Sequence, residues 1–129
     1  MAIDNERLPL EEKAGQVNLE LPRGYFRVHE LGLVNLQPWW FIEGPRVAAV
    51  YDSVNRRFPS RHVLPFARRL DCDDVACIVV EECGHDPGEV VVVHDYAVPG
   101  TEVERRAPHF WEWFRSAVDD MIMRSESAG

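Results

Sequence analysis

Hydrophobic residues recur at helical spacing in two segments of the chain. In the first segment they occupy one helical face at Val47, Val50, Tyr51, Val54 and Phe58. This spacing is typical of a helix that buries one side. Pro45 suits the first helical turn, where its missing N–H needs no partner, and Pro59 disfavours helix at the residue before it. The pattern predicts a helix over residues 45–57.

The second helical pattern lies near the end of the chain. Its broad apolar face comprises Phe110, Trp113, Phe114, Ala117, Val118, Met121 and Ile122. Pro108 again occupies a position that suits a first helical turn. We expect an amphipathic helix over residues 108–123 that packs across a β-sheet.

Apolar runs predict the strands of that sheet at His62–Ala67, Val75–Val80 and Glu89–Tyr96. Four consecutive valines, Val90–Val93, have no polar residue between them, which indicates a strand buried on both faces. Glycine and proline residues in segment 81–88 are typical of a loop that joins two antiparallel strands. The aromatic run 38–42 predicts another short strand. Residues 25–36 fit either a short helix or a strand followed by a loop.

Length and composition favour one folded domain. The chain has 129 residues, of which 46% are hydrophobic and 28% are charged. This is enough for one sizeable core and too little for two full domains. We expect a single domain over residues 14–124, with a mobile N-terminal arm, residues 1–13, before it and a frayed end, residues 125–129, after it.

The same sequence bears on location and on the cysteines. No apolar run approaches the roughly 18 residues of a membrane span, and the polar, acidic start lacks the layout of a secretory signal. We therefore expect a cytoplasmic protein that does not bind a membrane. Cys72, Cys77 and Cys83 are odd in number and lack Cys-x-x-Cys spacing, so we interpret them as buried thiols.

Charge argues against one class of function and leaves another open. With 22 acidic and 14 basic residues the formal net charge is −8, which argues against a general nucleic-acid binder. Residues 71–104 contain ten acidic residues and no lysine or arginine, whereas arginines crowd residues 46–69. This acidic block fits either a solvated surface or a landing surface for a basic partner.

The patterns expected of a catalytic or metal site are incomplete. The acidic run 71–74 lacks the further ligands and the glycine of a calcium loop, so we interpret it as a turn. His94 and Asp95 are adjacent on a predicted strand and point to opposite faces, away from His85 in a loop. No nucleophile or phosphate-loop motif occurs. We predict no catalytic residue, no metal site and no cofactor.

Four segments carry a family resemblance when they are taken in order: Asn35–Phe41, Val63–Cys77, Gly88–Asp95 and Phe110–Phe114. They contain an aromatic segment, a strand with the letters PFA, an acidic turn, a valine strand and a terminal aromatic helix. This order, over roughly residues 20–123, resembles the SUKH superfamily. That superfamily is the Smi/Knr-like group of bacterial toxin-immunity proteins and fungal cell-wall regulators.

The resemblance implies an α+β domain in which helices pack against a mainly antiparallel sheet, without catalytic activity. Many bacterial members neutralise a toxin, often a nuclease, by direct binding. Together with the acidic charge, the resemblance predicts an immunity-type protein-binding module whose partner is a basic toxin domain. The carboxylates expected to contact that partner are Asp73, Asp74, Glu81, Glu82, Asp86 and Glu89.

Two other functions stay open at this point. A regulatory or scaffold domain with a different cellular partner would share each of these features, and a small metal-dependent enzyme would need a bound metal. The identity of the partner and the oligomeric state are open as well. We interpret the tryptophans mainly as core residues, with one exposed member as an anchor for a partner, among Trp39, Trp40, Trp111 and Trp113.

Overall fold

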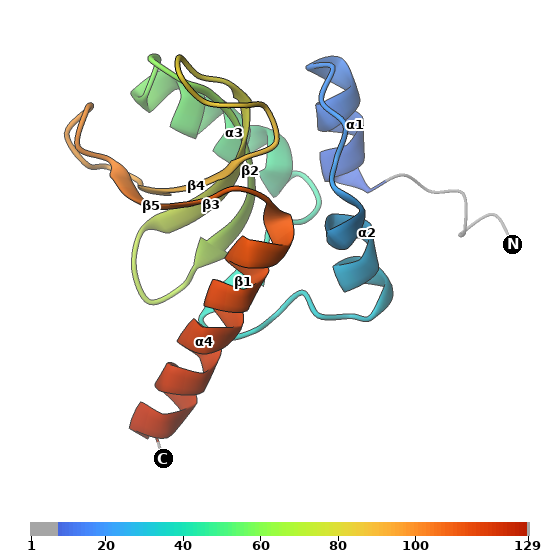
Figure 1. Ribbon diagram of the computed structural model, residues 1–129, viewed down its shortest axis with the longest axis vertical. Helices are drawn as coiled ribbons and strands as arrows, with labels where there is room; N and C mark the ends of the chain where they lie inside the picture. Colours follow the sequence, from blue (N-terminus) through green and yellow to red (C-terminus); the bar gives the residue numbers. More distant parts are fainter. Residues whose placement is uncertain (1–7, 129) are drawn as a thin grey trace, which may run out of the picture.

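Five antiparallel strands form a meander in which each strand pairs with its neighbour in the sequence (Figure 1). The computed structural model describes residues 8–128. The strands are β1 (Trp39–Phe41), β2 (His62–Arg69), β3 (Asp74–Glu81), β4 (Val90–His94) and β5 (Val103–Ala107). The helices are α1 (Pro9–Gln16), α2 (Arg23–Glu30), α3 (Arg46–Arg57) and α4 (Phe110–Ala128). The predicted α+β class with a C-terminal helix is confirmed.

One face of the sheet packs against α1, α2 and α4 through an aromatic core. In Figure 1, α1 and α2 stand beside the sheet, and α4 runs from the end of β5 past the other elements. The ring of Trp113 on α4 lies 5.3 Å from that of Trp39 on β1 and 4.8 Å from that of Phe66 on β2, between centroids. Tyr25 of α2 meets Phe66 edge-on at 6.5 Å. These rings hold α2 and α4 against β1 and β2.

The other face of the sheet packs against α3. Val54 and Phe58 are buried there against alternate residues of the central strands. The Asn55 side chain donates from Nδ2 to the Val63 carbonyl and accepts from the Val63 N–H, both at 2.9 Å. This amide satisfies two backbone groups at the start of β2 and fastens α3 to the sheet.

Most of the predicted elements are confirmed. Helix α3 begins one residue after the predicted start, and β1 lies within the predicted aromatic run. Strands β3 and β4 pair antiparallel through the expected hairpin, and the four valines of β4 are buried. The open segment 25–36 contains the end of α2 and a loop. No helix within residues 8–128 is both long and apolar enough to cross a membrane.

The predicted mobile arm over residues 1–13 includes a helical stretch in its second half. Residues 9–13 belong to α1, and residues 1–7 of that arm lie outside the described part of the chain. Pro9 occupies the first helical position, and Leu10 and Ala14, one turn apart, are buried in the core. Two buried positions are too short a pattern to indicate this helix in the sequence.

Three smaller predictions differ from the structure. Helix α4 continues to Ala128, so residues 125–128 are helical rather than frayed, since no glycine or proline interrupts them. Strand β4 ends at His94 because Tyr96 adopts a φ of 70°, which bends the chain away from the sheet. Cys77 is buried, but Cys72 and Cys83 are exposed because they lie in the loops before and after β3.

Candidate functional site

A buried carboxylate, Glu102, lies at the centre of an ion-pair network. Its side chain is 0% exposed and accepts hydrogen bonds of 2.9 and 2.6 Å from Nε and Nη2 of Arg61. The N–H of Gly100 donates a further bond of 2.6 Å. Burial favours the neutral carboxyl, but backbone N–H donors and Arg61 outweigh it and hold the pKa of Glu102 below its ordinary value. Glu102 thus fastens the β4–β5 loop to the segment before β2.

Glu82, from the acidic block, belongs to the same network. Arg61 binds its carboxylate, and so does Arg106, whose Nη2 lies 2.6 Å from Oε2. Burial opposes ionisation, but the two guanidinium groups lower the pKa of Glu82. Both arginines lie outside residues 71–104. The fold therefore pairs charges that the sequence separates.

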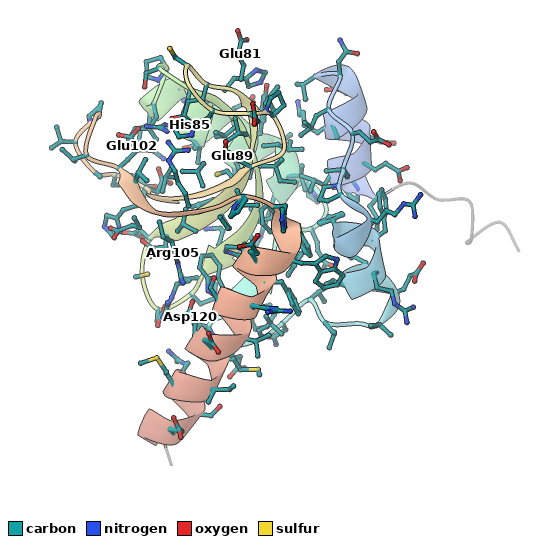
Figure 2. All side chains as sticks on the ribbon, in the orientation of Figure 1. Glu81, His85, Glu89, Glu102, Arg105 and Asp120 are labelled. Carbon is teal, nitrogen blue, oxygen red and sulfur yellow. The ribbon has the colours of Figure 1, made fainter. Side chains whose placement is uncertain are left out.

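Two more carboxylates are neutralised in the same way. Arg57 of α3 donates to Asp95 with 2.7 Å between Nε and Oδ1. Asp120 of α4 accepts from the Trp39 indole N–H at 2.8 Å and from Arg105. Figure 2 labels Arg105 and Asp120 where β5 faces α4. Both carboxylates already form hydrogen bonds within the chain and are not free to bind a partner.

The six carboxylates predicted to contact a partner gather at the two ends of β3. Two lie at or before the start of β3, and the other four lie at or after its end. Strand β3 has eight residues, which separates its ends by about 23 Å. Figure 2 labels Glu81, His85 and Glu89 in the region of the β3–β4 hairpin, with Glu81 pointing outward.

Among residues 8–128, half of these carboxylates have a side-chain partner. His94 binds Asp74, two arginines bind Glu82, and His85 binds Glu89. The exposed members are Asp73, Glu81 and Asp86. Arginine and histidine side chains of the same chain therefore already bind three of the six predicted contact carboxylates, and the other three are exposed.

An open groove lies along β1, the end of β2 and the start of α3. Its volume is about 350 Å³, and it is lined by Trp40, Phe41, Ile42, Glu43, Arg46, Arg68 and Leu70. Trp40 and Arg68 are cross-strand partners, so their side chains leave the same face of the sheet. The groove thus combines apolar surface with guanidinium groups, a pairing that the sequence analysis did not identify.

The two adjacent tryptophans of β1 have opposite environments. Trp39 is 0% exposed, whereas Trp40 is 38% exposed and Leu70, across the groove, is 64% exposed. Within residues 8–128, neither Arg46 nor Arg68 forms an ion pair with a carboxylate. Trp111 on α4 is also exposed, at 46%, so two of the four tryptophans and not one have the exposure expected of an interface anchor.

Another cluster joins the ends of three neighbouring strands. The Nδ1 atom of His94 on β4 lies 2.9 Å from Oδ1 of Asp74 on β3 and 4.0 Å from Oε1 of Glu104 on β5. The hydrogen bond to Asp74 raises the pKa of His94. His85 and Asp95, the other residues considered with His94 in the sequence, bind different partners.

The register of the hairpin explains why this cluster was missed. Ile78 pairs with Val90, and counting four residues outward along both strands brings Asp74 opposite His94. The pairing of Asp74 with His94 could have been predicted from the hairpin if the exact residues of its turn had been known. The approach of Glu104 depends on the β4–β5 pairing, which no sequence pattern indicated.

Comparisons of the chain with protein-family models, with curated proteins and with solved structures found no match.

Proposed function

We propose that this chain is a non-catalytic, cytoplasmic protein-binding module that neutralises a cognate toxin by direct association, as immunity proteins do. The observation that carries the proposal is the groove at Trp40. Tryptophan and arginine are the residue types that most often dominate the free energy of protein association. Trp40, Arg46 and Arg68 meet in this groove beside exposed apolar surface. The resemblance of the sequence to the Smi/Knr-like group supplies the kind of partner.

The charge of the chain favours a basic partner. The formal net charge is −8, which attracts a positively charged protein from a distance and raises the rate of encounter. Asp73 is exposed and lies in the same turn as Leu70, which lines the groove. A basic partner seated on Trp40 therefore directs its basic groups toward Asp73 and its own hydrogen-bond acceptors toward Arg46 and Arg68. Glu81 and Asp86, at the other end of β3, influence the encounter rate and not the seated complex.

The buried ion pairs support a non-catalytic role. A general acid or base works best when its pKa lies near the operating pH. The pKa values of Glu82 and Glu102 are displaced downward, away from neutrality, by their arginine and backbone donors. Carboxylates fixed in this way act as permanent anions that hold strands and loops together.

The proposal is tested by capture from cells of the organism that encodes the chain. The baits are the unmodified chain, Trp40→Ala and Asp73→Lys. Val98→Ala serves as a matched control because Val98 is an exposed hydrophobic residue in the β4–β5 loop. We expect the unmodified chain and Val98→Ala to retain a basic toxin domain, identified by mass spectrometry, and Trp40→Ala to lose it.

Capture of a housekeeping assembly by all four baits would contradict the proposal and favour a scaffold role. A second measurement separates neutralisation from simple binding. One equivalent of the chain should abolish the activity of the captured toxin domain. Binding without inhibition would leave the groove as a protein-binding site and remove the immunity role.

A further inference from the structure

Asp74, His94 and Glu104 each present one ligand atom to a common point. These three atoms all lie within 4.8 Å of one another. The residues belong to β3, β4 and β5, so three hydrogen-bonded strands hold them. Asp74 and His94 are direct cross-strand partners. An imidazole between two carboxylates is a donor set that a divalent transition-metal ion accepts.

Glu104 owes its place in the cluster to an irregularity of β5. Val92 pairs with Arg105 and Val93 with Val103, so Glu104 is an extra residue between two paired positions. An extra residue of this kind bends the strand and redirects the side chain. Glu104 reaches toward His94, whereas Arg105, the next residue, binds Asp120 of α4.

We propose that Asp74, His94 and Glu104 bind one Zn²⁺ ion. Zinc bonds of about 2.0–2.2 Å to nitrogen and oxygen place neighbouring tetrahedral ligand atoms about 3.4 Å apart. The separations of 2.9 and 4.0 Å from the His94 nitrogen lie on either side of that value. The Glu104 side chain is 50% exposed, so it can close the difference without moving the sheet.

The ligand chemistry selects among ions. Magnesium and calcium prefer oxygen ligands alone, whereas an imidazole nitrogen favours zinc. Three protein ligands leave one tetrahedral position open, and the His94 side chain is 41% exposed beside it. Water or a side chain of another protein fills that position. Because the cluster exists only in the folded chain, zinc binding stabilises the fold by mass action.

The test is a calorimetric titration of zinc chloride into the full-length chain, prepared without an affinity tag. Exposed thiols also bind zinc, so the parent protein carries Cys72→Ser and Cys83→Ser. We expect one zinc ion per chain in this parent. His94→Gln and Glu104→Gln should each abolish stoichiometric binding. His109→Gln is the matched control, since His109 is exposed and bound to a single carboxylate.

An imidazole NMR spectrum supplies a second readout. One equivalent of zinc should shift the ring signals of His94 and leave those of His109 in place, and excess magnesium should not reverse the shift. The proposal is overturned if the parent binds no stoichiometric zinc, or if His94→Gln or Glu104→Gln binds zinc as the parent does. Should His94→Gln fail to fold, as judged by circular dichroism, Glu104→Gln decides the question alone. Either outcome leaves the groove at Trp40 unaffected.

Discussion

The Arg61 guanidinium donates two hydrogen bonds, 2.9 and 2.6 Å long, to one oxygen of the buried Glu102 carboxylate, 41 residues further along the chain. This pair joins the arginine-rich segment of the sequence to its acidic block. Arg57, Arg69 and Arg106 make equivalent contacts with acidic residues of the same block. The separation of charge along the sequence is thus largely cancelled when the strands come together.

Removing the Glu102 charge should destabilise the fold strongly. Glu102→Gln leaves the Arg61 guanidinium with one ionic partner, Glu82, in a buried setting. Loss of one partner from a buried ion pair costs about 3–5 kcal/mol, and we expect the lower end because Glu82 remains. Chemical denaturation measures the change in the free energy of unfolding. The exposed residue Glu112 is the control, and Glu112→Gln should change stability by less than about 0.5 kcal/mol. Equal effects of the two variants would contradict the structural role of Glu102.

His29 should make the chain less stable in mild acid. Its ring lies against those of Tyr25 and Phe41, and its Nε2 is buried without a hydrogen-bond partner among residues 8–128. Burial lowers the pKa of His29, although Glu43 opposes this. The unfolded chain therefore binds a proton first, near the ordinary histidine pKa of about 6.5, and the free energy of unfolding falls below that pH. In His29→Leu the loss of stability between about pH 7 and pH 5 should be smaller. Urea unfolding of both proteins between these pH values measures the difference. The same pH dependence in His29→Leu and in the unmodified chain would contradict the prediction.

The cysteines should react in two stages. Cys72 and Cys83 are exposed, whereas Cys77 is buried within β3, where burial also raises the pKa of its thiol. A thiol-specific reagent should therefore label two cysteines in the folded chain and the third only after unfolding. The variant with Cys72→Ser and Cys83→Ser should show no labelling before unfolding. Rapid labelling of Cys77 in that variant would contradict the burial of its side chain within β3.

Substitution of the two adjacent tryptophans should lower the stability of the fold to different extents, because Trp39 is a core residue and Trp40 lines the groove. Trp39 is fully buried, packs on Trp113 and donates to Asp120, so Trp39→Ala should cost about 3–5 kcal/mol of stability. Trp40 already exposes part of its ring in the groove, so Trp40→Ala should cost less than half as much. Thermal unfolding of both variants measures the difference. Similar losses would mean that Trp40 is a core residue and not an anchor.

Local patterns in the sequence predicted the local structure well. Helix α3 follows from the spacing between Val47 and Phe58 and from the prolines that flank it. The valines of β4 indicated a strand covered on both faces, and they do alternate between the two core clusters on either side of the sheet. In each case the pattern spans a dozen residues or fewer. Over that length the spacing of hydrophobic residues indicates directly which positions are buried.

Contacts between distant segments were not predictable in the same way. The partners of Glu82 and Glu102 depend on how β2, β3 and β5 align, and that alignment is set by core packing. The position of Glu104 depends on one extra residue in β5, which leaves no mark in the hydrophobic pattern. The groove at Trp40 has the same origin, since Arg46 and Arg68 meet there only in the folded chain.

We propose that the chain neutralises a toxin through the groove at Trp40. The decisive measurement is the activity of the captured toxin domain in the presence of the unmodified chain and of folded Trp40→Ala. We expect one equivalent of the unmodified chain to abolish the activity of the toxin domain and one equivalent of Trp40→Ala to leave most of it. Equal inhibition by both proteins, or capture of no toxin domain, would show that the groove at Trp40 does not neutralise a toxin.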